Sequence, residues 1–186
     1  MRKLLSALLY TALIGVANPG LADMDAIADL RTGDMRKLIF HSAPMDGSDV
    51  AFTHEDGSEM SLAAYEGQYV VLNFWATWCA PCRKEMPHLS ALQTQMGGDA
   101  MQVVTVATGR NARPAMERFL DEIGVDNLPL HTDARQALAR SMGVLGLPAT
   151  IILNPQGQEI ARMQGEADWS SDSAIAIMQA LIDTPS

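Results

Sequence analysis

Residues 69–82 read YVVLNFWATWCAPC, and this stretch carries the strongest indication of the fold. Its first eight residues form a nearly continuous apolar run, which is typical of a strand buried on both faces of a sheet. The apolar side chains of residues 86–96 then recur at helical spacing and predict a helix from Cys79 to Met96, ended by Gly97. A buried strand that runs into a helix suggests the first half of a βαβ unit.

Cys79 and Cys82 are the only cysteines of the sequence, and they stand at the start of this predicted helix. The first N–H groups of a helix have no helical partner and the helix dipole is positive there, so a thiolate at Cys79 would be stabilised. Because the thiolate is the nucleophile, we expect Cys79 to attack a disulfide and Cys82, one turn later, to resolve the mixed disulfide. The pair would then act as a redox-active disulfide that passes two electrons.

Other interpretations of the cysteine pair remain open at this point. A purely structural disulfide would close so short a loop that loop entropy contributes only about 2 kcal/mol, against about 4.7 for a long loop. A zinc site usually needs four ligands, and no second CxxC exists. A copper-handling module could use Cys79, Cys82 and His88, and a thiol oxidase could use the same scaffold. We expect no resident metal and no cofactor beyond the cysteine pair.

The segments after the cysteines predict alternating strands and helices. Residues 101–108 alternate as a second strand, and a second helix ends at Gly124. Asp133 and Gln136 resemble a capping box for a short helix over Ala134–Met142. Two further strands, 149–153 and 159–163, flank a turn, and apolar residues at 174–182 mark one face of a last helix. The order predicts an α/β fold with a mixed central sheet flanked by helices.

The residues before position 69 predict three regions. The first 22 residues follow the order of a signal peptide: Arg2 and Lys3 are positive, Leu4–Ala17 is an apolar run, and small residues stand at 20 and 22. The segment could also remain attached as an uncleaved anchor. We expect residues 1–22 to be this signal, 23–49 a polar leader with one helix at Asp25–His41, and 50–186 the folded domain. Within it, 51–62 predicts an N-terminal β-hairpin around Asp56-Gly57. Export implies a compartment in which disulfides persist.

Composition excludes several classes of protein. The chain has 186 residues, of which 48% are hydrophobic and 19% charged, so it is not disordered, collagenous or coiled-coil. Its formal charge is −9, from 13 basic and 22 acidic residues, which disfavours binding to nucleic acid. The same charge favours solubility and weakens attraction to anionic lipid.

Residues 65–87 as a whole, together with GVLGLPAT at 143–150, resemble the thioredoxin-like thiol:disulfide reductases of the TlpA/ResA group. The resemblance implies a thioredoxin-like fold, a periplasmic location and a reducing role toward a disulfide-containing protein substrate. In that group the role serves apocytochrome c thiols in cytochrome c maturation or copper-site assembly in respiratory oxidase. It also implies re-reduction by a membrane thiol donor, and we expect the chain to act as a monomer.

The same resemblance assigns further residues to the site. Pro148 corresponds to a cis proline that faces the cysteines, and Leu147 would present backbone groups to a substrate strand. Trp78 would flank the active surface. Thioredoxins proper have a buried Asp where this chain has Asn73, so Glu85 becomes the candidate for relaying the proton of Cys82.

Two local features favour a reductant over an oxidant. Pro81 has no N–H to donate to a thiolate, and no histidine lies between the cysteines to add positive charge. The nearby Arg83 and Lys84 act in the opposite direction. A reductant of the thioredoxin kind and a strong oxidant differ by about 150 mV, or about 7 kcal/mol for two electrons, so these features alone do not fix the potential.

Overall fold

A mixed sheet of eight strands runs through the molecule, in the order β1-β8-β7-β4-β5-β6-β2-β3. The computed structural model describes residues 19–184, so most of the predicted signal peptide lies outside the described residues. The strands are β1 (Ile39–Met45), β2 (Phe52–Thr53), β3 (Glu59–Met60), β4 (Tyr69–Trp75), β5 (Met101–Thr108), β6 (His131–Asp133), β7 (Ala149–Leu153) and β8 (Glu159–Gln164).

Strand β4 lies at the centre of this sheet. It pairs in parallel with β5 and antiparallel with β7, so that Leu72 lies between Val104 and Ile151. Every residue of β4 is buried. The apolar run therefore forms a strand covered on both faces, as the sequence predicts, and the sheet is mixed because β7 and β8 return as an antiparallel hairpin.

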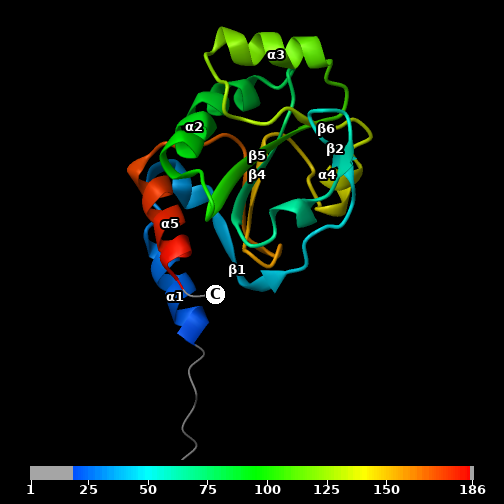
Figure 1. Cartoon of the computed structure of the whole chain (residues 1–186). Helices are drawn as coiled ribbons and strands as arrows, with labels where there is room; N and C mark the ends of the chain where they lie inside the picture. Colours follow the sequence, from blue (N-terminus) through cyan, green and yellow to red (C-terminus); the bar gives the residue numbers. More distant parts are fainter. Residues whose placement is uncertain (1–18, 185–186) are drawn as a thin grey trace, which may run out of the picture.

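Helices cover both faces of the sheet. The helices α1 (Pro19–Asp29), α2 (Ala80–Met96), α3 (Arg113–Glu122) and α5 (Asp172–Asp183) belong with one face, whose core includes Val71, Trp75 and Trp169. The other face packs against α4 (Ala137–Ser141) and the short 3-10 helix η2 (Leu62–Tyr65). Successive residues of β4 pack into the two cores in turn, because successive side chains of a strand point to opposite faces of the sheet. Figure 1 shows α1, α2 and α5 together on one side and α4 on the other.

The helix predicted over Asp25–His41 is wrong. Helix α1 ends at Asp29, and Gly33, with a φ of +51°, opens a 3-10 helix, η1 (Gly33–Lys37). Strand β1 follows and pairs antiparallel with β8 at the edge of the sheet. The apolar residues Met35, within η1, and Leu38, directly after it, are buried in the core without a continuous α-helix. Pro19 begins α1, and the first position of a helix is one that proline tolerates.

The capping box predicted at Asp133 and Gln136 is also wrong. Helix α4 begins at Ala137, and Gln136 precedes it with a φ of +57° and no capping hydrogen bond from its side chain. Asp133 instead ends β6, a strand that the sequence pattern missed. Its carboxylate accepts hydrogen bonds from the backbone N–H groups of Ala137 at 2.8 Å and Ala139 at 2.9 Å.

The remaining elements follow the predicted order. Strands β2 and β3 pair antiparallel over two residues each, a much shorter pairing than the 51–62 hairpin expected from the sequence. Strands β7 and β8 form the second hairpin, and α5 buries the predicted apolar face apart from Ile182, which is only partly buried. Across residues 19–184, no helix combines the length and apolar character needed to cross a bilayer.

Candidate active site

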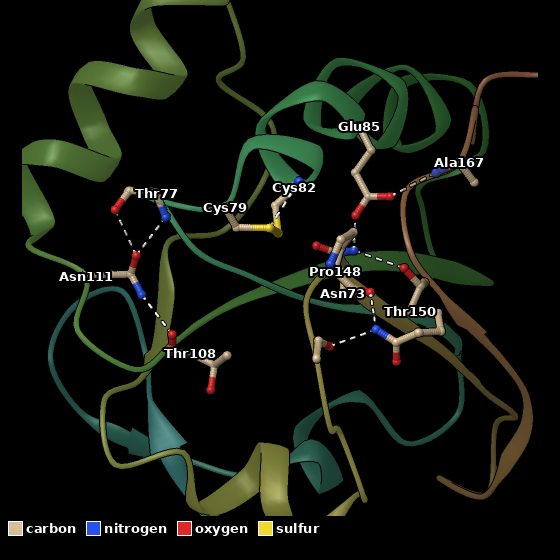
Figure 2. Close-up of a disulfide and its surroundings, with 12 residues drawn as sticks. Asn73, Thr77, Cys79, Cys82, Glu85, Thr108, Asn111, Pro148, Thr150 and Ala167 are labelled. Carbon is tan, nitrogen blue, oxygen red and sulfur yellow. Dashed lines mark hydrogen bonds between the residues drawn. A yellow bond between two sulfur atoms is a disulfide. The ribbon is translucent and has the colours of Figure 1, made fainter.

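Cys79 and Cys82 form a disulfide where β4 passes into α2 (Figure 2). Cys79 is the N-cap of α2, and its sulfur accepts a hydrogen bond from the backbone N–H of Cys82 at 3.3 Å. This is the position predicted from the sequence, and it directs the N–H group of Cys82, in the first turn of the helix, toward the sulfur. Cys79 is 6% exposed and Cys82 is fully buried. The two sulfurs therefore differ in their access to a partner.

The turn between β4 and α2 is fixed by an amide side chain from the neighbouring loop. Asn111 Oδ1 accepts hydrogen bonds from the backbone N–H and the hydroxyl of Thr77, at 2.8 and 3.0 Å. Asn111 Nδ2 in turn donates to the carbonyl of Thr108 at 3.0 Å, which links the turn to the end of β5. Sequence reasoning missed Asn111, because nothing in its local pattern signals a partner that is distant in the sequence.

A hollow of about 560 Å³ opens beside Cys79. Trp78 and Leu147 line it, so the structure brings these two expected residues together with Cys79. Trp78 is 64% exposed and Leu145, also on its wall, is 98% exposed. The peptide bond from Leu147 to Pro148 is cis, as the family resemblance implies. Exposed apolar side chains around a reactive sulfur make a surface suited to another polypeptide.

Among the described residues, Arg140 is the only charged one that lines this hollow, and neither Cys82 nor Glu85 lines it. The rest of its wall comes from Pro81 in the first turn of α2, from the end of β5, from α4 and its preceding turn, and from the loop before β7. The hollow therefore gives access to Cys79 alone.

Glu85 lies on α2 one turn after Cys82 and is only 1% exposed. Its Oε1 accepts a hydrogen bond from Asn73 Nδ2 at 2.7 Å, and its Oε2 accepts one from the backbone N–H of Ala167 at 3.2 Å (Figure 2). Burial raises the pKa of Glu85 to about 7, although these two hydrogen bonds act in the opposite direction. A carboxyl group with this pKa can take up or release a proton near neutral pH.

The neighbours of Glu85 complete a buried polar group on the sheet. Asn73 Nδ2 also donates to Thr150 Oγ1 at 2.9 Å, across the register that pairs β4 with β7. Asn73 Oδ1 and the indole nitrogen of Trp169 have no hydrogen-bond partner in the described part of the protein. The Trp169 indole still lies close enough to the Glu85 carboxyl to lower its pKa slightly. The family resemblance pointed to Glu85, but nothing in the sequence indicated that Thr150 and Ala167 are its neighbours in this group.

A second, smaller hollow of about 60 Å³ reaches Glu85 from outside. Charged side chains surround it, and Lys84 Nζ lies 2.6 Å from Glu166 Oε1 while His88 Nδ1 lies 3.1 Å from Asp168 Oδ1. A polar space of this size has room for water. It shares no lining residue with the hollow beside Cys79.

The described residues contain no group of three or more His, Cys, Asp and Glu side chains placed to hold a metal ion. His88 is engaged with Asp168 and with the Ser170 hydroxyl at 3.1 Å.

Comparison with known proteins agrees with this geometry. Residues 44–161 match the AhpC/TSA family. The chain is 32% identical to the thiol-disulfide oxidoreductase ResA of Bacillus subtilis over 123 residues, covering 64% of this chain and 68% of ResA. It is also 32% identical to ResA of Halalkalibacterium halodurans over 111 residues, covering 59% of this chain and 62% of that relative.

A solved structure shares the fold. The crystal structure of a thiol:disulfide interchange protein DsbE from Chlorobium tepidum superposes with a TM-score of 0.65 at 23% identity, and the match covers 75% of this chain and 96% of DsbE. The match confirms the thioredoxin-like arrangement of sheet and helices. The chain therefore belongs to the AhpC/TSA family, among the ResA-like thiol:disulfide oxidoreductases.

Proposed function

We propose that this protein is an exported reductant of protein disulfides, acting in the periplasm with the Cys79–Cys82 pair and no other cofactor. One observation carries the proposal: Cys79 opens onto an apolar hollow, whereas Cys82 is sealed on the side of Glu85. That asymmetry separates an attacking sulfur from a resolving one. The signal-like order of residues 1–22 supports export.

The reaction begins with the reduced pair. The Cys79 thiolate attacks one sulfur of a substrate disulfide, the substrate S–S bond breaks, and the second substrate sulfur leaves as a thiolate that takes a proton from water. Cys82 then loses its proton and attacks the Cys79 sulfur. The Cys79–Cys82 bond forms, the mixed disulfide breaks, and the first substrate sulfur leaves as a thiolate. Two electrons have passed from the protein to the substrate, and a membrane thiol donor restores the dithiol.

Glu85 is the group we assign to the proton of Cys82. The two residues are three apart on α2, so their side chains share one side of the helix. With a pKa near 7, the ionised carboxyl can accept the thiol proton as Cys82 attacks. The small hollow on its other side gives that proton a way to solvent while a substrate covers Cys79.

Substrate docking is assigned to Trp78, Leu147 and Pro148. An extended segment of the substrate would pair with the backbone of Leu147 and rest its apolar side chains near Trp78, which gives affinity with little sequence preference. We propose apocytochrome c thiols or the copper-site proteins of a respiratory oxidase as substrates, by analogy with the TlpA/ResA group.

A cysteine variant tests the assignment of roles. In Cys82→Ala, the Cys79 thiolate can attack but nothing resolves the product, so a mixed disulfide with a model protein disulfide should accumulate on a non-reducing gel. Cys79→Ala is the matched control and should trap little, because Cys82 is buried. Accumulation through Cys82 in that control would reverse the assignment.

The direction of electron flow has a separate test. Equilibration of the wild-type pair with glutathione, followed by alkylation of free thiols, gives the reduction potential. We expect a value on the thioredoxin side of the range, near −270 mV rather than near −120 mV. A value close to that of the strong oxidants would make the protein a thiol oxidase on the same scaffold.

A further inference from the structure

One side chain of β8 holds the segment that carries Leu147. Gln164 is the last residue of β8 and pairs with Ala149 at the start of β7. The two N–H bonds of its side-chain amide have two acceptors, because Nε2 lies 3.0 Å from the carbonyl oxygens of both Gly146 and Pro148. The backbone N–H of Gly165 also donates to the Pro148 carbonyl at 2.9 Å.

These contacts occupy the acceptors on both sides of Leu147 but leave Leu147 itself free. Within residues 19–184, no hydrogen bond involves the backbone N–H or C=O of Leu147. Leu147 also lines the hollow beside Cys79. Among the three residues 146–148, Leu147 therefore offers an incoming chain both a free N–H donor and a free C=O acceptor, whereas the carbonyls on either side of it are already engaged.

We propose that Gln164 is a positioning residue for thiol:disulfide exchange, which fixes the register of a substrate polypeptide beside Cys79 by occupying the carbonyls on either side of Leu147. The inference rests on the proposed function, in which the substrate pairs with Leu147. An exposed glutamine outside the cysteine motif then decides which substrate residue faces the attacking sulfur.

The geometry of an extended chain explains why register matters. Each residue advances a strand by about 3.3 Å, and a slip of one residue turns its side chain to the opposite face. Nucleophilic attack needs the two sulfurs close and aligned, so a slipped substrate presents no target to Cys79. A small disulfide without a polypeptide backbone has no register and is independent of Gln164.

The test compares Gln164→Met with Gln68→Met in the full chain. Methionine keeps about the length of glutamine but cannot donate. Gln68 is the matched control because its Nε2 also donates to a loop carbonyl, that of Gly98 at 3.3 Å, and it lines neither hollow. Three rates are measured for each protein: reduction of a disulfide-bonded polypeptide, reduction of a small aromatic disulfide, and alkylation of Cys79 by iodoacetamide.

We expect Gln164→Met to lower kcat/KM for the polypeptide about tenfold, which corresponds to about 1.4 kcal/mol. The rates with the small disulfide and with iodoacetamide should be unchanged, and Gln68→Met should match wild type in all three. An equal loss in all three rates would show a merely structural role and overturn the proposal, as would an unchanged rate with the polypeptide.

Gln164→Glu gives an independent check. The ionised carboxylate cannot donate to the two carbonyls, but the protonated form regains one donor. Its polypeptide rate relative to wild type should therefore recover as the pH falls, and a flat ratio would contradict the proposal. If wild type reduced no polypeptide, the proposed function would fail. The Gln164 comparison would then use oxidised protein and a dithiol peptide, because the reverse reaction passes through the same mixed disulfide.

Discussion

The buried carboxyl of Glu85 should make stability depend on pH in a way that a single substitution removes. Burial raises its pKa from 4.5 to about 7 in the folded protein. Between these values the folded chain holds a proton that the unfolded chain has released, so the free energy of unfolding falls as the pH rises. The stability that the protonated Glu85 carboxyl contributes is fully present below about pH 4.5 and is lost as the pH rises through about 7.

The size of the effect follows from the same two pKa values. Each pKa unit corresponds to about 1.4 kcal/mol, so ionising the buried carboxyl costs about 3 kcal/mol of stability. Glu85→Gln stays neutral at every pH. Placing its amide against the N–H donors of Asn73 and Ala167 carries a penalty, but that penalty is constant with pH. The difference between wild type and variant should therefore move by about 3 kcal/mol in favour of the variant from pH 4.5 to pH 8.

Urea denaturation of both proteins at several pH values measures this difference. The oxidised form is used, because disulfide-bonded cysteines do not titrate. A difference that stayed constant across the range would refute the raised pKa, and with it the assignment of Glu85 as a proton relay near neutral pH. In the same reasoning, Glu85→Gln should slow the resolving step and leave the alkylation of Cys79 unchanged.

Three further predictions concern other parts of the fold. Burial lowers the pKa of His131 to about 4, so stability should fall by up to about 3 kcal/mol as the pH drops below 6.5, and urea titrations of His131→Phe should lack that fall. Trp78→Ala should change stability by less than about 0.5 kcal/mol but slow reduction of polypeptides, and a large loss of Tm would contradict its surface role. Asp133→Ala leaves two α4 N–H groups unpaired and should cost about 1–2 kcal/mol in chemical denaturation.

His131 and Glu85 also explain why variants are needed to see either effect. Protonation of His131 lowers the free energy of unfolding as the pH falls, whereas ionisation of Glu85 lowers it as the pH rises. Between about pH 4.5 and 6.5 the two slopes oppose each other in wild type. A flat wild-type profile in that range is therefore compatible with two strongly perturbed groups.

The failures of sequence reasoning have a common physical cause. The helical spacing over residues 25–41 was real, but Gly33 adopts a left-handed conformation and the residues after it gain more by pairing with β8 than by continuing a helix. The short β6 was missed because three residues carry too little periodicity. Its position depends on parallel pairing with β5. In each case tertiary contacts decided between local structures that the sequence left nearly equal.

The sequence by itself determined the elements whose signals are local: the buried strand β4, the helix α2 that begins at the cysteines, and the pairing of Cys79 with Cys82 one turn apart. Local order suffices there because a strand and a helix start are defined by neighbouring residues. Only the tertiary structure decided which cysteine is the more exposed, that Glu85 meets Asn73 and Ala167, and that Gln164 donates to the carbonyls of Gly146 and Pro148. Those relations join residues far apart in the chain, and their energies depend on burial and on distances that exist only once the sheet has formed.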